Sequence, residues 1–321
     1  MHFSPATFRW GARSLTPLSL VLGAASLCSA GTITYNYTGN DFTYAVAPYT
    51  TGDSIAGSFT IASPLAPDLV NQPITPSSYS FSDGLLSYTS TGSYLAFDIS
   101  TAASGTITGW LILVCEEDVT DCGHQPGIHF LVTEDVVPTV FDGVQVQGEG
   151  YEATVNSDPG TWTATLNGFQ GGTSSAPVLL ISGTPVAEVT GTIGGIGSQE
   201  YYSFLWGGGA FSATASITGA NTGASYLFSE GVAGTCSSGG PQTLNGGDSF
   251  SSTIAIANLP AGQYCIGIDA NNSNDPPFAL TFNTPVEGVP TPEPSTFVLF
   301  AVGLGMVVSA LRLARRSRKN S

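Results

Sequence analysis

Residues 33–38 read Ile-Thr-Tyr-Asn-Tyr-Thr, so that large apolar side chains alternate with small polar ones. This period of two places the apolar side chains on one face of an extended segment, which is the pattern of a half-buried β-strand. The alternation recurs at residues 55–61 and then at short intervals along the chain, whereas no long segment shows the 3.6-residue period of an amphipathic helix. The sequence therefore predicts an all-β fold.

Further strands are predicted by the same alternation at 94–99, 106–114, 127–133, 161–166, 178–182, 200–206, 210–217, 224–229, 250–256, 262–268 and 278–282. Turn residues separate them at Asp83-Gly84, Asp142-Gly143, Asp158-Pro159-Gly160, Gly207-Gly208-Gly209 and Gly246-Gly247. Short strands at regular spacing with polar turns are typical of β-sandwiches.

The domain organisation follows from changes in composition. Residues 168–176 (GFQGGTSSA) are small and polar, which predicts a linker between two β-sandwich modules at 31–167 and 177–284. Each module is long enough to bury a core of its own. Residues 285–294 contain several prolines and no core pattern, so they are predicted as a semi-extended stalk.

Charge is distributed very unevenly over the 321 residues, which include 23 acidic and 7 basic side chains. All acidic residues lie between Asp41 and Glu293, and residues 14–311 contain neither Lys nor Arg, so this body has a formal charge of −23. Binding to nucleic acid is excluded because it needs Lys and Arg to displace counterions from phosphates. Phosphate-handling enzymes are disfavoured because they use Lys, Arg or Mg²⁺ as clamps.

The first 30 residues are predicted as a secretory signal peptide. Arg9 and Arg13 precede an apolar run at 15–27, and the small residues at 28–30 (CSA) place the cleavage after Ala30. The alternatives are a buried N-terminal helix and a lipid anchor on residue 28, although a lipoprotein signal has a small residue where Leu27 stands.

Residues 295–312 are predicted as a single transmembrane helix. The uncharged run at 297–311 (FVLFAVGLGMVVSAL) is near the lower limit for a span once its flanks are added. The tail at 313–321 is basic, and the positive-inside rule places it in the cytoplasm with the body outside. The basic residues of this end are Arg312, Arg315, Arg316, Arg318 and Lys319.

Pro292, Glu293 and Pro294 stand directly before this span. Pro-Glu-Pro, one short apolar span and an Arg-rich end, in this order, resemble the PEP-CTERM protein-sorting signal. The resemblance implies export, recognition by an exosortase-type processing enzyme, cleavage near Pro-Glu-Pro, and delivery to the cell surface or extracellular matrix of a bacterium that makes extracellular polysaccharide. The three residues would be a processing tag rather than catalytic groups.

Both modules carry weaker resemblances. The second resembles the bacterial pre-peptidase C-terminal domain, a small β-sandwich, at 199–204 (QEYYSF), 224–228 (ASYLF) and 259–268 (LPAGQYCIGI). The acidic pair that this family has before the first Tyr is reduced here to Glu200, which weakens any metal site carried over. The first module resembles N-terminal regions common in PEP-CTERM proteins at 57–59, 80–84, 105–110 and 159–162, and these imply no assigned activity.

Four cysteines remain after removal of the signal peptide: Cys115, Cys122, Cys236 and Cys265. An even number in an exported chain indicates disulfides, and three pairings are open. Pairing within modules, Cys115–Cys122 and Cys236–Cys265, is the economical one, and each bond would contribute about 2–4 kcal/mol. The alternative is a zinc site in which His124 and His129 join the first two cysteines, although their spacing is longer than usual.

Calcium is the one cofactor considered. Asp269, Asn271, Ser273 and Asp275 present oxygen side chains at alternate positions, as calcium loops do. The twelve-residue loop pattern then fails at its sixth and twelfth positions, so a solvated turn is the competing interpretation. The acidic run at 116–121 allows the same two interpretations.

No motif for a Ser hydrolase, a zinc peptidase or a phosphate-binding loop is present. Trp110, Trp162 and Trp206 would stack on sugars if exposed, but their place in alternating strands favours the core. The sequence predicts an exported, non-catalytic surface or matrix protein with a structural or adhesive role. Two alternatives stay open: a carbohydrate-binding protein, calcium-dependent or not, that acts on extracellular polysaccharide, and a secreted glycosidase or peptidase.

Overall fold

The structure is a computed structural model, and it describes residues 31–91, 94–116, 127–136, 139–146, 150–175, 177–180, 183–193, 198–218, 224–232, 235–236, 242–246, 249–270 and 276–287. The predicted signal peptide, transmembrane helix and basic tail lie outside these ranges. Within them, no helix is long and apolar enough to cross a membrane.

The described residues form strands throughout and no helix, so the all-β prediction is confirmed. In the first half the strands are β1 (Thr32–Asp41), β2 (Tyr44–Ala45), β3 (Ser54–Ile61), β4 (Gln72–Pro73), β5 (Ser78–Ser82), β6 (Ser87–Thr89), β7 (Tyr94–Thr101), β8 (Ile107–Cys115), β9 (His129–Val136), β10 (Thr139–Val146), β11 (Gly150–Asn156) and β12 (Thr161–Asn167). In the second half they are β13 (Val178–Leu179), β14 (Val186–Thr192), β15 (Ser198–Trp206), β16 (Gly209–Thr218), β17 (Ala224–Val232), β18 (Thr235–Cys236), β19 (Gln242–Gly246), β20 (Ser249–Leu259), β21 (Gly262–Ala270) and β22 (Pro277–Val286).

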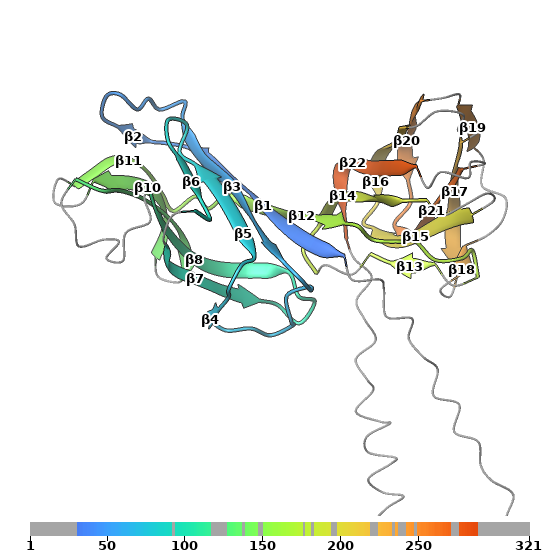
Figure 1. Cartoon of the computed structure of the whole chain (residues 1–321), viewed down its shortest axis with the longest axis horizontal. Coiled ribbons are helices and arrows are strands. Elements are labelled where there is room, and N and C mark those ends of the chain that lie inside the picture. Colours follow the sequence, from blue (N-terminus) through green and yellow to red (C-terminus); the bar gives the residue numbers. More distant parts are fainter. Residues whose placement is uncertain are drawn as a thin grey trace, which may run out of the picture.

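Three sheets hold these strands (Figure 1). Sheet A is the longest and has the order β20-β16-β22-β14-β12-β1-β3-β5-β6. Sheet B has the order β2-β11-β10-β9-β8-β7-β4, and sheet C has the order β13-β15-β21-β17-β18, with β19 also paired to β17. Sheets A and B form the first sandwich, and sheets A and C form the second.

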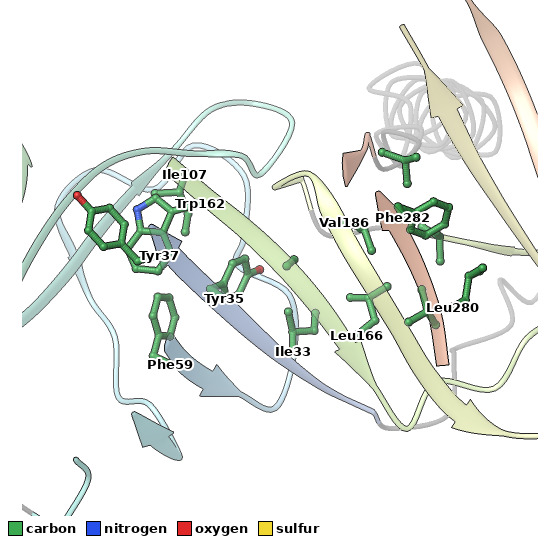
Figure 2. Packing of buried hydrophobic residues seen from close by; sticks show 14 of the residues in the cluster. Ile33, Tyr35, Tyr37, Phe59, Ile107, Trp162, Leu166, Val186, Leu280 and Phe282 are labelled. Carbon is green, nitrogen blue, oxygen red and sulfur yellow. The ribbon is translucent and has the colours of Figure 1, made fainter. Parts of the chain in front are cut away.

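Sheets B and C cover the same face of sheet A. Trp162 of β12 packs against Trp110 of sheet B, with ring centroids 5.8 Å apart. Leu166 lies on the same face of β12 as Trp162. Its register partner on β14 is Val189, whose partner on β22 is Leu280, so all three lie on this face of sheet A. On β22, Phe282 of this face packs against Phe204 of sheet C, 5.3 Å between centroids. The core is therefore one continuous layer, and Figure 2 shows it running from Tyr37 to Phe282.

The predicted linker does not separate the two sandwiches in space. Parallel pairing joins β12 to β14, so sheet A continues through the boundary. Gly172 pairs with Tyr201, and the Thr106 hydroxyl of the β7–β8 connection donates to the Gly183 carbonyl. The boundaries of the two modules as folding units stay a prediction, but in the structure the modules share a sheet and a core.

The prediction of a turn at Asp142-Gly143 is wrong. Both residues lie in the middle of β10, where Asp142 is 1% exposed and Gly143 leaves room for the Phe141 ring. Asp-Gly is a strong local turn signal, but here tertiary contacts override it. The predicted strands also omit β5, β6, β11, β14 and β19. Of these, β5 (SYSFS) shows the alternation and was overlooked.

Candidate functional site

Cys236 and Cys265 form a disulfide with their Cα atoms 5.7 Å apart, as pairing within the second module predicts. Cys115 is also disulfide-bonded, whereas Cys122 and His124 lie outside the described residues. A disulfide sulfur is not a thiolate, so Cys115 is not available as a zinc ligand. The disulfide at Cys115 contradicts the zinc alternative. The oxidised state of Cys115, Cys236 and Cys265 agrees with an exported chain.

A polar hollow of about 430 Å³ lies beside the Cys236–Cys265 bond. Its lining residues are Gly171, Gly172, Thr173, Ser174, Gln199, Glu200 and Tyr201. The segment carrying the glycines is held over sheet C by two contacts, the Gly172–Tyr201 bridge and the bond from the Cys236 amide to the Ser174 carbonyl. At Gly171 a Cβ atom would lie 2.8 Å from the Glu200 backbone, so only glycine allows this approach.

Hydrogen bonds order the floor of this hollow. The Tyr201 hydroxyl donates to Gln199 Oε1 at 2.9 Å, and Gln199 Nε2 donates to Asp269 Oδ2 at 3.5 Å. Burial, and then the charge of Asp269, raise the pKa of the Tyr201 hydroxyl. The hydroxyl therefore stays protonated, and the hollow offers an amide, hydroxyls and backbone groups to a neutral polar ligand.

The structure describes one of the four calcium candidates, Asp269. Asp269 lies at the end of β21 with Oδ1 buried and without a hydrogen bond, whereas Asn271, Ser273 and Asp275 lie outside the described residues. In the described part of the chain, no group of three or more His, Cys, Asp or Glu side chains could hold a metal ion. A calcium site stays a prediction.

His129 is the single histidine among the described residues, and it faces Glu152. Its Nδ1 lies 3.6 Å from Glu152 Oε2, with 29% and 26% of the two side chains exposed. The pair joins β9 to the bulged end of β11. It forms an ion pair when His129 is protonated.

Asp142 is the centre of a buried polar network in the first sandwich that the sequence did not reveal. The Tyr37 hydroxyl donates to Asp142 Oδ2 at 2.7 Å and itself accepts from the Gly160 amide at 3.0 Å. Thr133 also hydrogen-bonds the carboxylate, and Trp110 Nε1 donates to Thr133 Oγ1 at 2.8 Å. Burial raises the Asp142 pKa to about 6 against the lowering effect of these bonds. Burial and the Asp142 charge raise the pKa of Tyr37 well above its ordinary value.

Asp83 is a second buried carboxylate, and its acceptor sites are filled. The amides of Leu85 and Leu86 donate to Oδ1 at 2.9 and 2.7 Å. The hydroxyls of Tyr49 and Tyr88 donate to Oδ2 at 2.9 and 2.7 Å. The predicted turn at Asp83-Gly84 is confirmed, with Gly84 at φ +96°, and its carboxylate ties the β5–β6 turn to the core.

Trp110, Trp162 and Trp206 are buried, with 4%, 6% and 8% of their surface exposed. The core interpretation is confirmed, and these rings cannot stack on a sugar at the surface. The exposed aromatic side chains of the described part are Tyr44, Tyr94 and Tyr151, which come from sheet B.

The sorting motif, Pro292, Glu293 and Pro294, and the basic residues at 312–319 lie outside the described residues. Their assignment comes from sequence comparison. Residues 290–319 match the family model of the PEP-CTERM protein-sorting motif. The chain carries a PEP-CTERM sorting signal. Such a signal indicates an exported protein that an exosortase sorts at the membrane and delivers to the cell surface. The resemblance of the second module to the pre-peptidase C-terminal domain stays a prediction.

Comparison with curated proteins gives no match. Among solved structures, the chain is similar to a variant of an exo-β-1,3-galactanase from Phanerochaete chrysosporium in complex with β-1,3-galactotriose. The identity is 8%, the TM-score is 0.21, and 79% of this chain and 78% of that chain are covered. A tryptic core variant of Bacillus thuringiensis Cry1Da gives 11% identity and a TM-score of 0.18 over 82% of this chain and 51% of that one. These low scores carry no functional argument.

Proposed function

We propose that this PEP-CTERM protein is a non-catalytic surface or matrix protein with a structural or adhesive role. The observation that carries the proposal is the sorting motif at 290–319, which is joined to a disulfide-bonded all-β body. The chemistry of the body supports this role. Two of its buried carboxylates, Asp83 and Asp142, are engaged with tyrosines in the core, and His129 has Glu152 as its neighbour.

Processing at the motif is tested by the variant Glu293→Ala expressed in the native host. The proposal expects the wild-type protein at the surface or in the medium without its basic tail, and the variant retained in the membrane fraction with the tail. Glu287→Ala is the matched control, because Glu287 is exposed at the end of the described body and lies before the motif. Equal processing of the Glu293 variant would argue against exosortase sorting.

The second candidate function is binding of extracellular polysaccharide, with or without calcium. The polar hollow beside Cys236–Cys265 favours it, because its hydroxyl, amide and backbone groups suit a neutral sugar. Binding to glycan arrays is measured with calcium and with EDTA. Binding that EDTA abolishes would indicate a calcium-dependent site, and unchanged binding would indicate recognition without calcium. Gln199→Ala then tests the hollow, because Gln199 lines it.

A secreted glycosidase or peptidase is the third candidate. It requires turnover of polysaccharide or peptide by the purified chain, with loss of turnover on changing a specific pair of carboxylates. Asp83 and Asp142 are enclosed in the core, so the pair to change first is Glu200, which lines the hollow, with Asp269, which is bonded to the lining residue Gln199.

A further inference from the structure

Among the described strands, none packs against the face of sheet A that points away from the core, over either sandwich. Sheets B and C pack against the same face, so the side chains of the other face have no sheet against them. On β1, Ile33 and Tyr35 are fully buried, whereas Thr34 between them is partly exposed. On β16, Ala213 and Ala215 are fully buried, whereas Thr214 between them is partly exposed.

Polar side chains form one continuous row across this face, and all but one of them are hydroxyls. Consecutive register partners on eight neighbouring strands are Ser78, Thr60, Thr34, Thr165, Glu188, Thr281, Thr214 and Thr253. Neighbouring strands are about 4.8 Å apart, so the row extends about 33 Å. Glu188 stands at the seam between the two sandwiches and is the one charged member of the row.

Two shorter rows flank the first and have the same character. One consists of Ser251, Ser216, Ala279, Thr190, Asn167 and Thr32. The other consists of Thr163, Asn36, Ser58, Ser80 and Thr89. Neither row contains a charged or an aromatic residue. We call the three rows together the hydroxyl face.

Lateral hydrogen bonds fix the side chains of the hydroxyl face. The hydroxyls of Thr34 and Thr60 are 2.9 Å apart, and those of Thr214 and Thr253 are 2.7 Å apart. Asn167 Nδ2 donates to Thr34 Oγ1 at 2.9 Å. A hydroxyl is one donor and two acceptors, so each of these groups keeps hydrogen-bonding capacity toward the outside. Threonine is also stiff at χ1, which reduces the entropy lost on binding.

We propose that the hydroxyl face binds a neutral polysaccharide lying across the strands of sheet A. The inference rests on the proposed role at the cell surface and names the partner and the surface that would serve it. A hydroxyl lattice offers alternating donors and acceptors, which is what a polyhydroxylated chain needs. Each hydroxyl contact is weak singly, and such contacts add up along an extended polymer.

Charge favours a neutral polymer over an acidic one. The body has a formal charge of −23 and no Lys or Arg, so an anionic polysaccharide would be repelled, whereas a neutral one is not. A second copy of the chain is a poorer occupant, because the core of a stable protein interface is enriched in apolar and aromatic side chains, and the hydroxyl face has none larger than alanine among its apolar members.

The test compares matched double variants of the full chain, purified in mild detergent. Thr34→Val/Thr214→Val removes two hydroxyls from the long row and keeps side-chain shape and strand propensity. Thr34→Glu/Thr214→Glu adds charge at the same places. Thr51→Val/Thr139→Val and Thr51→Glu/Thr139→Glu are the controls, because both threonines are exposed and lie outside sheet A. Circular dichroism and melting curves check that all variants fold.

Binding is measured by depletion of the protein on insoluble cellulose and on curdlan, with alginate beads as the acidic probe. The wild type is expected to bind a neutral polymer and not alginate, and both Thr34/Thr214 variants to bind about tenfold more weakly than wild type, with the Thr51/Thr139 controls unchanged. Binding to neither neutral polymer, or equal binding by the folded row variants, would overturn the proposal. A change in sedimentation mass instead of glycan binding would assign the face to self-association. Each of these results is independent of processing at Glu293, so the proposed function can stand when this inference fails.

Discussion

The two sandwiches share sheet A, but sheet B and sheet C pack against it through different kinds of contact. In the first sandwich, buried polar groups join the aromatic core: Tyr37 is bonded to Asp142, and Trp110 is bonded to Thr133. In the second sandwich, the described core between sheets A and C is made of packed rings and a disulfide lies on the outer side of sheet C. The first arrangement is sensitive to protons, and the second is sensitive to packing and to reduction.

The largest effect is expected from truncating the ring at the centre of the second sandwich. Phe204 is fully buried and contacts Phe211 and Phe282 at 5.6 and 5.3 Å between centroids. Phe204→Ala is expected to lower the free energy of unfolding by about 4 kcal/mol, because it leaves a cavity among these rings.

Chemical denaturation followed by near-ultraviolet circular dichroism measures this loss. Leu85→Ala is the control, because Leu85 is 47% exposed, and it should cost less than about 0.5 kcal/mol. Since the core is continuous through β12 and β14, the signals of both sandwiches are expected to shift together. Two separate transitions, with the first sandwich unchanged, would show that the shared sheet does not couple them.

In the first sandwich the comparable change is Asp83→Ala. The substitution removes the acceptor of four hydrogen bonds. Two of them come from the Tyr49 and Tyr88 hydroxyls, which lose their Asp83 carboxylate partner inside the core. The expected loss of stability is about 3 kcal/mol. Asp158→Ala, at an exposed turn, is the control in the same thermal unfolding series. Equal melting temperatures for the two variants would mean that the carboxylate of Asp83 does not hold the turn.

The pH dependence distinguishes the two sandwiches further. The Asp142 pKa is about 6 in the folded chain and 3.8 ordinarily, so the folded state holds this proton more tightly than the unfolded chain. The contribution of Asp142 to stability is therefore highest below about pH 4 and falls by about 3 kcal/mol as the pH rises through 6.

Unfolding in denaturant at pH 4, 5, 6 and 7 measures this slope. Asp142→Asn keeps an acceptor for Tyr37 and cannot ionise, so its profile is expected to be flatter than that of the wild type between pH 4 and 7. A wild-type profile that matches that of Asp142→Asn between pH 4 and 7 would contradict this. It would show that ionising Asp142 does not lower the free energy of unfolding.

A comparable effect, with the widest expected range, comes from removing the disulfide of the second sandwich. Cys236 and Cys265 are 29 residues apart in sequence, so their bond is expected to contribute about 2–4 kcal/mol by restricting the unfolded chain. Cys236→Ala/Cys265→Ala should lower the melting temperature in non-reducing buffer and leave only the effect of a reductant on the disulfide of Cys115. No difference from wild type would indicate that the strain of the folded bond cancels its benefit.

The alternation that predicted β1 and β16 places apolar residues at every second position, and there the sequence was sufficient. It failed at β10, because Asp142-Gly143 is a turn by its local chemistry but pairs with β9 and β11 in the fold. The Asp142 carboxylate also accepts from Tyr37, which is 105 residues away. Long-range partners cannot be read from one sequence. For the same reason the hydroxyl face could not be predicted, since Thr34, Thr165 and Thr214 become neighbours only through the strand order of sheet A.

The candidate sites divide in the same way. The sorting motif is contiguous in sequence, so Pro292, Glu293 and Pro294 were recognisable directly, and the family match at 290–319 agrees. The hollow is built from two segments, 171–174 and 199–201, that meet only because Gly172 pairs with Tyr201. No local pattern marks such a site.

Export, oxidation and sorting are tested together by the intact mass of the protein recovered from the surface and the medium of its native host. Intact mass is needed because residues 14–311 offer trypsin no site. The account predicts a chain from Gly31 to near Pro292-Glu293-Pro294, less four hydrogens for two disulfides, with any excess due to glycosylation. A mass that includes the basic tail with Arg315 and Lys319 would contradict sorting and leave a simple membrane anchor.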